Sequence, residues 1–240
     1  MKKLLPIILL LSLSNLAPAS DIKFDARLVQ SEFNEFVKDF GTALWFNPMA
    51  PAETLGVMGF DVSIESSFTD VGSEKSYWKK VFSNGDTYSY IPVPRLHVQK
   101  GLPFNIDIGA MYVAVPDTNI KIWGIEAKYA LLEGTVVTPA ISVRASYSRL
   151  QGVDELAMDT KSLDLLISKG FLMFTPYAGV SLVKISGSEN SDLVTLNDVD
   201  ESDKRLIMGL QVSPFPLLII NAEASFGNVP QYALKFGMRF

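Results

Sequence analysis

From about residue 54 to residue 240, hydrophobic and polar residues alternate with a period of two. In 59–66, for example, three apolar residues alternate with Asp61, Ser63 and Glu65. Successive side chains of a β-strand point to opposite faces, so such a run has one apolar and one polar face. Clusters of Gly, Pro, Asn and Asp separate the runs. The pattern predicts ten strands, over 54–69, 88–100, 104–115, 119–132, 138–149, 160–169, 173–186, 204–213, 217–227 and 230–240.

The predicted connections at the two ends of the strands differ in length. The tight ones fall at one end, and the long ones, 70–87, 151–159 and 187–203, fall at the other. A tilted strand needs about 9–11 residues to cross the hydrocarbon of a bilayer, whereas strands of ordinary sheets average about 5–6. Short periplasmic turns and long outer loops are typical of transmembrane barrels. We therefore expect an all-β fold over 53–240: an antiparallel transmembrane β-barrel of about ten strands, with eight to twelve as the range.

The period changes in the N-terminal segment, over 20–52. Phe33, Phe36, Val37 and Phe40 are spaced i, i+3, i+4 and i+7, and Gly41 suits the end of a helix. The spacing predicts a short amphipathic helix over 31–40. A helix of this length is marginal alone, so its apolar face must be buried at the barrel mouth, in the lumen or at the membrane interface. We expect the segment to seal the periplasmic end or to act as a plug.

The first 19 residues have the features of an export signal. Lys2 and Lys3 precede an apolar run over 4–13, and Ala17-Pro18-Ala19 supplies small residues for cleavage. The run is shorter than the roughly 20 residues of a membrane-spanning helix. We expect residues 1–19 to be a cleaved signal peptide.

Composition narrows the function classes. The chain has 240 residues, a formal net charge of −5, 48% hydrophobic residues and no cysteine. A mildly acidic chain lacks the basic surface that nucleic-acid binding requires. Without cysteine there are no disulfides, thiolate metal sites or cysteine nucleophiles. We expect no nucleic-acid partner, no metal and no cofactor.

The last predicted strand carries a resemblance. Tyr232, Leu234, Phe236, Met238 and Phe240 alternate with small or charged residues, and the sequence stops at Phe240. This resembles the C-terminal strand of bacterial outer-membrane β-barrel proteins, in which a terminal aromatic is part of the signal for the barrel-assembly machinery. The resemblance implies that Phe236, Met238 and Phe240 form this signal. It also implies an outer-membrane location, with lipid, lipopolysaccharide and the assembly machinery as partners. A soluble exported barrel of the lipocalin kind is the alternative.

If the apolar faces meet lipid, the charged residues of the other parity line the lumen. An Arg or Lys on the lipid face would cost about 2–4 kcal/mol near the midplane. A ten-stranded barrel is narrow, so these charges either pair and close the lumen or line a polar path. The predicted lumen residues are Asp61, Glu65, Asp107, Glu126, Asp164 and Glu223, together with Arg95, Lys128, Arg144, Arg205, Lys235, Arg239 and His97.

His97 is the single histidine of the chain and the main candidate for proton transfer near neutral pH. It lies close to the short turn at Lys100, whereas outer-membrane hydrolases place such a group near the outer rim. We therefore expect no enzymatic activity, and we expect His97 to hydrogen-bond an acid such as Asp107.

A second resemblance lies between the predicted helix and the first strand. Asn47-Pro48-Met49 ends a plug-like segment, and Gly59-Phe60 opens the strand. This is similar to the long-chain fatty-acid transporter family of the outer membrane, although that family has fourteen strands and usually has Ala where Met49 stands. In that family a hatch fills the lumen and hydrophobic ligands leave through the wall. The resemblance implies transport of hydrophobic compounds.

Two functions therefore follow from the sequence. The first is a channel or transporter for small or hydrophobic compounds, whose ligand the sequence does not identify. The alternative is a structural or surface-binding barrel, without catalytic activity, that displays 70–87 and 187–203.

Overall fold

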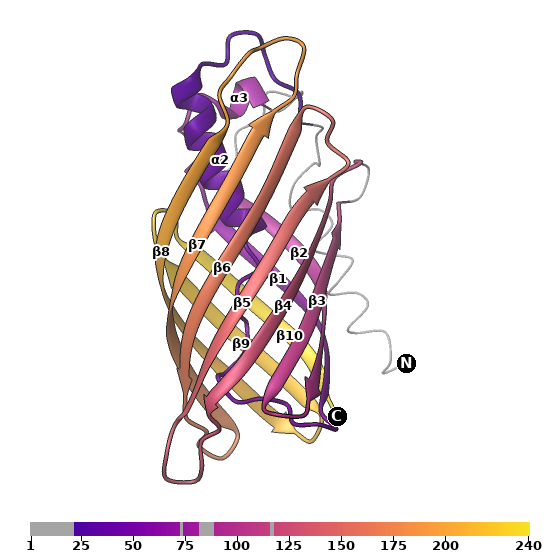
Figure 1. Ribbon diagram of the computed structural model, residues 1–240, viewed down its shortest axis with the longest axis vertical. Coiled ribbons are helices and arrows are strands. Elements are labelled where there is room, and N and C mark those ends of the chain that lie inside the picture. Colours follow the sequence, from indigo (N-terminus) through magenta and orange to yellow (C-terminus); the bar gives the residue numbers. More distant parts are fainter. Residues whose placement is uncertain (1–21, 73, 82–88, 116–117) are drawn as a thin grey trace.

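The computed structural model describes residues 22–72, 74–81, 89–115 and 118–240. The predicted signal peptide lies outside the described residues. Ten antiparallel strands form a closed barrel in which each strand pairs with its neighbours in sequence and the first pairs with the last (Figure 1). This confirms the predicted fold. The strands are β1 (Phe60–Asp70), β2 (Tyr90–Leu102), β3 (Ile106–Ala114), β4 (Lys121–Leu132), β5 (Ala140–Gln151), β6 (Leu156–Ser168), β7 (Phe174–Glu189), β8 (Val199–Phe215), β9 (Leu218–Phe226) and β10 (Gln231–Arg239).

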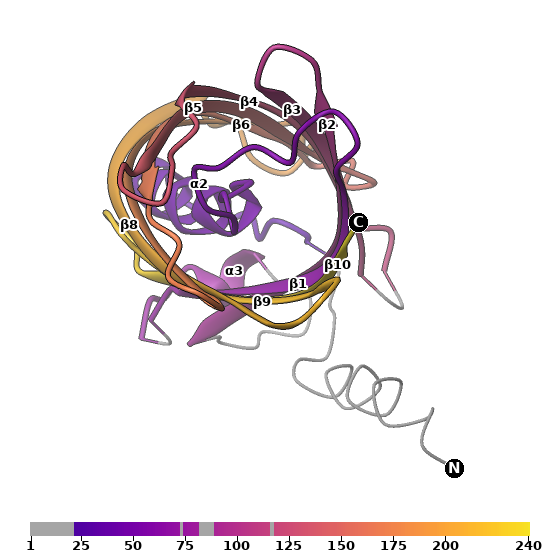
Figure 2. The ribbon, with the colours of Figure 1, turned by 90° about the horizontal axis from the view of Figure 1, so that it is seen from below.

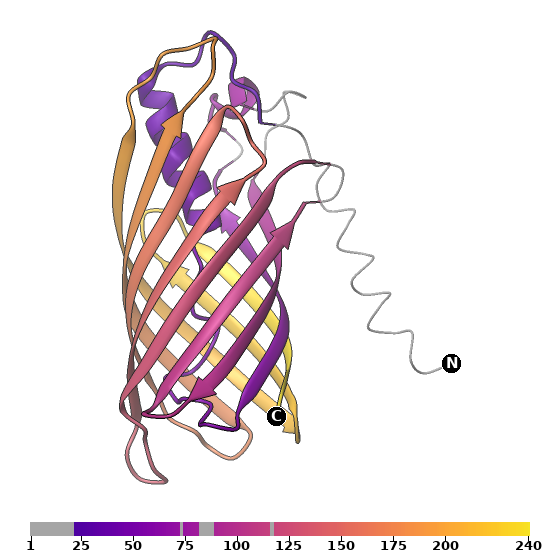
Figure 3. The ribbon, with the colours of Figure 1, turned by 45° about the vertical axis from the view of Figure 1, so that its right-hand side comes forward.

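The two ends of the barrel differ. The connections 103–105, 133–139, 169–173 and 216–217 lie at the end that holds the C-terminus, which we call the short-connection end. The described residues of the β1–β2 connection, 71–72, 74–81 and 89, and the connection 190–198 lie at the opposite end, which we call the long-connection end. The connection 152–155 at this end has only four residues, so the long loop predicted over 151–159 is wrong, because β6 begins at Leu156. Strands β6, β7 and β8 extend beyond their predicted bounds toward the long-connection end, so the wall is taller on that side (Figure 3).

The first strand begins later than predicted. Residues 54–59 do not extend the ladder, because the chain turns at Gly56, which has a φ of 72°, and Gly59 donates a hydrogen bond back to the Gly56 carbonyl. The turn packs closely against β2, where a Cβ on Gly101 would lie 1.9 Å from the Gly56 oxygen. This contact needs glycine at position 101.

The outer face of the barrel is apolar. On β10, Tyr232, Leu234, Phe236 and Met238 are 43–49% exposed, whereas Lys235 between them is fully buried. The same alternation runs along the other strands. The polar face of the strands therefore points into the barrel.

The helix predicted over 31–40 runs as α2 (Gln30–Leu44) inside the barrel (Figure 2). It contacts β1, β2 and β5–β8 at the long-connection end. The helix therefore lies at the end opposite the tight turns, and not at the end that a seal beside the tight turns would require. The reason is the composition of the inward positions. Near the long connections these are apolar, as at Ile122, Val183 and Ile185, and they match the apolar face of the helix.

The described part of the connection between β1 and β2 covers this apolar core at the long-connection end. It contains the short helix α3 (Trp78–Val81), in which Trp78 and Val81 are buried. The Phe36 ring of α2 packs edge-on against Tyr77 and Trp78, with centroids 6.1 and 6.0 Å apart. The long-connection half of the barrel is therefore filled by a hydrophobic core, as in a soluble domain. Among the described residues, no helix is long and apolar enough to cross a bilayer.

After α2, residues 45–59 continue along the lumen to the short-connection end, where β1 begins (Figures 1 and 3). Wall residues hold this stretch along its length. Ser148 donates a hydrogen bond to the Leu44 carbonyl, and Lys128 donates to the carbonyls of Pro51 and Glu53. We call residues 45–53 the lumen segment.

Candidate functional site

The thirteen predicted lumen residues all lie on inward-facing positions of the wall. Twelve are buried, and only Arg239, near the short-connection end, keeps 29% of its side chain exposed. Positive and negative groups meet directly, so an ion-pair network fills the interior below the hydrophobic core of the long-connection half. Because buried charges are costly unless they are paired and hydrogen-bonded, this pairing is what allows the interior to be charged.

The centre of the network joins six strands. Glu65 on β1 meets Arg95 at 2.5 Å, Lys235 at 3.5 Å and the His97 Nδ1 at 2.8 Å. The His97 Nε2 lies 3.1 Å from Glu126 on β4. Arg144 on β5 completes the chain of contacts by meeting both Glu126 and Asp164 on β6.

His97 hydrogen-bonds acids, as expected, but they are Glu65 and Glu126, and Asp107, the acid suggested from the sequence, is not among them. The register places Asp107 opposite Gly101, near the end of β2, whereas Ser63 stands opposite His97. The histidine therefore reaches the neighbouring Glu65 and, across β3, Glu126. Asp107 instead lies 3.1 Å from Lys128 and accepts hydrogen bonds from the Leu55 backbone N–H.

Two further groups lie toward the ends. Near the short-connection end, Asp61 meets Lys235 at 3.3 Å and Arg239 at 3.0 Å. Toward the long connections, Arg205 pairs with Asp203 at 2.6 Å and lies over the Trp45 ring, 4.9 Å from its centroid. Asp203 was expected in a loop. It has the parity of Arg205, and a longer β8 would have identified it as an inward residue.

The network also holds the lumen segment. The Phe46 ring lies between two guanidinium groups, 5.0 Å from the Arg95 Cζ and 4.8 Å from the Arg144 Cζ, and packs edge-on to His97. Arg144 donates a hydrogen bond of 2.9 Å to the Phe46 carbonyl, and Arg95 donates one of 3.1 Å to the Asn47 carbonyl. The same arginines thus pair with the wall acids and bind the segment.

Glu223 holds Asn47 and Met49 of the segment. It accepts hydrogen bonds from the Asn47 Nδ2 at 2.6 Å, the Met49 backbone N–H at 2.9 Å and the Tyr177 hydroxyl at 3.0 Å. Asn221 donates to the Met49 carbonyl. Met49 has a φ of 47°, which is uncommon for a residue with a side chain and persists only when its surroundings hold it. We call Arg95, Arg144, Asn221 and Glu223, with their contacts to residues 46–49, the latch.

The lumen segment fills the space around it. Trp45, Phe46, Met49 and Ala52 have no accessible surface at all. A water-filled path beside the segment would expose these side chains to solvent. The sequence identified Arg95, Arg144 and Glu223 of the latch from parity, but it did not identify residues 46–49 as their partners.

Above the latch, Asp39 of α2 is fully buried and bonds the Tyr77 hydroxyl and the Lys75 Nζ. Burial raises the pKa of the Asp39 carboxyl, and these two hydrogen bonds oppose the rise. The contacts join the helix to the β1–β2 connection.

The described residues contain no group of three or more histidines and acids able to hold a metal ion.

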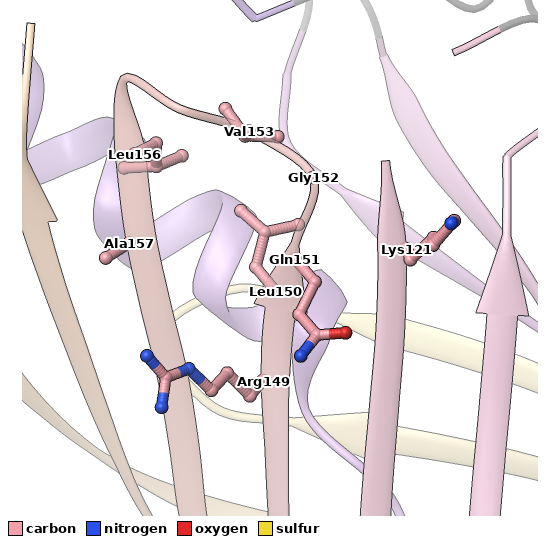
Figure 4. A pocket seen from close by; sticks show the side chains of 8 residues that line it. All are labelled: Lys121, Arg149, Leu150, Gln151, Gly152, Val153, Leu156 and Ala157. Atoms are coloured by element: carbon pink, nitrogen blue, oxygen red, sulfur yellow. The ribbon is translucent and has the colours of Figure 1, made fainter. Parts of the chain in front are cut away.

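Two pockets lie on the surface of the barrel. The first, of about 490 Å³, lies at the rim where β5 ends and β6 begins, and includes Lys121 and Arg149 (Figure 4). The second, of about 560 Å³, lies on the outer wall of β6–β8 and includes Leu163, Leu182 and Lys204.

No protein-family model and no curated protein matches this chain. Solved structures with a similar fold include the KdgM porin, with 13% identity, a TM-score of 0.41, and coverage of 75% of this chain and 99% of that one. The Ail protein of Yersinia pestis, bound to the heparin analogue sucrose octasulfate, has 13% identity, a TM-score of 0.31, and coverage of 76% and 98%. For the N-terminal β-barrel domain of Pseudomonas aeruginosa OprF the values are 13%, 0.34, and 77% and 99%. Likeness at this level does not indicate a common function.

Proposed function

We propose that this chain is an integral outer-membrane barrel that its own N-terminal segment keeps closed, and that it acts through its exposed surface rather than as an open pore. The observation that carries the proposal is the complete burial of the lumen segment at Trp45, Phe46, Met49 and Ala52. A pore of this diameter conducts only if its interior holds water, and the segment occupies that interior.

Placement in the outer membrane is supported by the outer wall. Exposed apolar side chains surround the barrel, while the predicted charged lumen residues of the same strands, apart from Arg239, are buried. This inversion is typical of proteins that meet lipid, because charges on the lipid face are costly. A closed barrel is also one of the few folds that satisfies every backbone hydrogen bond in a membrane. The assembly signal at Phe236, Met238 and Phe240 is part of this proposal.

The energetics of the N-terminal segment favour permanent closure. Phe33 and Phe36 have no exposed surface and Phe40 keeps 7%, and burial of each such side chain is worth about 1.5–3 kcal/mol. The latch adds charge-assisted hydrogen bonds to the backbone of 46–49. Withdrawal would lose these contacts and would leave the wall arginines without their carbonyl partners. Thermal fluctuations would therefore rarely open the lumen.

A gated transporter for small or hydrophobic compounds is the second candidate. The latch is the observation that favours it, because side chains rather than strand pairing hold residues 46–49, and Met49 is held in a strained conformation. Such contacts can be exchanged for those of a ligand. Enzymatic activity is not part of either proposal, since His97 is enclosed between Glu65, Glu126 and Phe46.

Swelling of proteoliposomes in a small neutral sugar separates the two candidates. We expect the full-length protein to cause no swelling. A variant that lacks residues 22–52, shown to be folded by its heat-shifted gel mobility, should admit the sugar. Swelling with the full-length protein would overturn the closed barrel, and swelling that appears only after a hydrophobic compound is added would favour the gated transporter.

A further inference from the structure

The outer wall carries an uneven distribution of basic residues. Five exposed bases lie on β4–β8 toward the long-connection end, and we call them the basic belt: Lys121, Arg149, Lys161, Lys184 and Lys204. On β1–β3, β9 and β10, as the structure describes them, the exposed positions toward the same end carry no lysine or arginine. A belt on one side only is not explained by general solubility.

Three of these bases are adjacent on the wall. Lys161 and Lys184 stand directly opposite each other on β6 and β7, and Lys204 on β8 is opposite Leu182, two residues from Lys184. Like charges directly across a strand pair are destabilising. Lys161 and Lys184 have acidic neighbours in Asp159 at 3.8 Å and Asp200 at 3.6 Å, with lysine side chains 66% and 57% exposed. Ion pairs this long and exposed contribute little, so an anion beside the lysines would relieve their repulsion.

The height of the belt matches a headgroup layer. About ten residues of β7 and of β8 lie between these lysines and the short-connection end, which is the length that a tilted strand needs to cross the hydrocarbon. The exposed neighbours toward that end are apolar, as at Leu163, Val180 and Leu206. The belt therefore stands at the edge of the apolar band, on the side of the long connections.

A shallow pocket lies next to Lys204, and two of its lining residues, Leu163 and Leu182, are two positions along the strand from Lys161 and Lys184. The 560 Å³ pocket on β6–β8 includes Lys204, and its apolar lining comes from Leu163, Leu165, Val180, Leu182 and Leu206. The 490 Å³ pocket at the rim includes the remaining two bases, Lys121 and Arg149 (Figure 4). Cationic groups above an apolar recess fit a molecule with an anionic head and hydrocarbon chains.

We propose that the basic belt binds the phosphates of a phosphorylated lipid of the outer leaflet, with an acyl chain in the pocket on β6–β8. The proposal rests on the membrane placement proposed above, but not on closure of the lumen. Lysine near a membrane surface is attracted to anionic headgroups, and the adjacent apolar recess adds selectivity for lipid over free phosphate.

Native mass spectrometry of the full-length protein in detergent tests the proposal. The probes are diphosphorylated lipid A and, as a lipid without net charge, phosphatidylcholine. We expect retention of lipid A and at least about tenfold weaker retention in the triple variant Lys161→Gln, Lys184→Gln, Lys204→Gln. The matched control is Lys23→Gln, Arg27→Gln, Lys79→Gln, which removes the same charge from exposed residues of the long-connection end and should bind as the unaltered protein does.

Equal retention of lipid A by the two triple variants would overturn the proposal. So would equal retention of phosphatidylcholine and lipid A by the unaltered protein. Displacement of lipid A by millimolar inorganic phosphate would show that the basic belt binds free phosphate rather than a lipid. This result would also overturn the proposal. Heat-shifted gel mobility confirms that each variant is folded. A folded barrel that stays in water without detergent would instead refute the membrane placement itself.

Discussion

Arg144 joins three parts of the interior at one guanidinium group. It pairs with Glu126 on β4 and Asp164 on β6, and it donates to the Phe46 carbonyl of the lumen segment. Its side chain is 1% exposed, so none of these partners has water as a substitute. Removal of this arginine leaves two buried carboxylates without their cationic partner. The loss of stability on removal is therefore larger than the net stability that the ion pairs contribute in the intact protein.

We predict that Arg144→Met lowers the free energy of unfolding by about 3–5 kcal/mol. Urea-induced unfolding in lipid vesicles measures the change. Lys161→Met is the control, because the Lys161–Asp159 pair is exposed and long, and it should change the free energy of unfolding by less than about 1 kcal/mol in either direction. Equal losses in the two variants would contradict the account of the network.

Apart from Asp203, the membership of the network was predictable from parity, but its pairing was not. Charges that recur on one face of each strand must share a compartment, so the inward positions of residues such as Glu65 and Lys128 follow from the alternation. The partners of His97 depend on the register of β2 and on whether its side chain can contact β4 across β3. The sequence pattern specifies neither, and for this reason Asp107 was the wrong partner.

At the scale of elements, the position of α2 decides how the barrel is filled. A Cβ on Gly41 would lie 2.2 Å from the Ile185 Cγ2, so the bare backbone of the helix rests on β7. Gly187 of β7 approaches Val37 in the same way. The helix itself was predictable from its 3.6-residue period. The end of the barrel at which the helix lies was not predictable in this way. The apolar inward residues Val183 and Ile185 of β7 are a sequence signal for it, because a polar lumen would not favour them.

We predict that Gly41→Val destabilises the protein by about 1–3 kcal/mol, the usual cost of an overpacked core. The second substitution Ile185→Ala removes the atoms that the new side chain meets. The double variant should therefore be more stable than the sum of the two single changes implies, as measured by urea unfolding of all four proteins. Strict additivity would mean that α2 does not rest on β7.

A disulfide between α2 and β7 tests the same packing directly. A Cβ at position 187 would lie 3.4 Å from the Val37 Cβ, close to the usual separation of about 3.5–4.5 Å in disulfides. We predict that Val37→Cys with Gly187→Cys forms an internal disulfide on mild oxidation, visible as a shift in gel mobility that a reductant reverses. The chain has no other cysteine. Val37→Cys with Ser142→Cys, which pairs the helix with the far end of β5, should not crosslink, and crosslinking of both pairs alike would indicate a mobile helix.

For the whole molecule, strand number and closure follow from the alternation of the sequence, whereas the loops predicted over 151–159 and 187–203 are shortened to 152–155 and 190–198 by the longer β6, β7 and β8. The content of the lumen does not, because it depends on how an N-terminal segment with its own period fits between strands that are distant in sequence. Residues 45–53 carry no period that predicts burial. Their place is determined by the apolar core above them and by the arginines, Asn221 and Glu223 around them.

The central claim is that the resting barrel is closed, and conductance in a planar lipid bilayer tests it most directly. The full-length protein, with heat-shifted mobility as proof of folding, is compared with the oxidised and reduced forms of the Val37→Cys, Gly187→Cys variant. A general diffusion porin in the same bilayer shows that insertion is detected. We predict no current steps from the full-length protein or from either form of the variant. Steady unitary steps from the folded full-length protein would contradict the closed lumen.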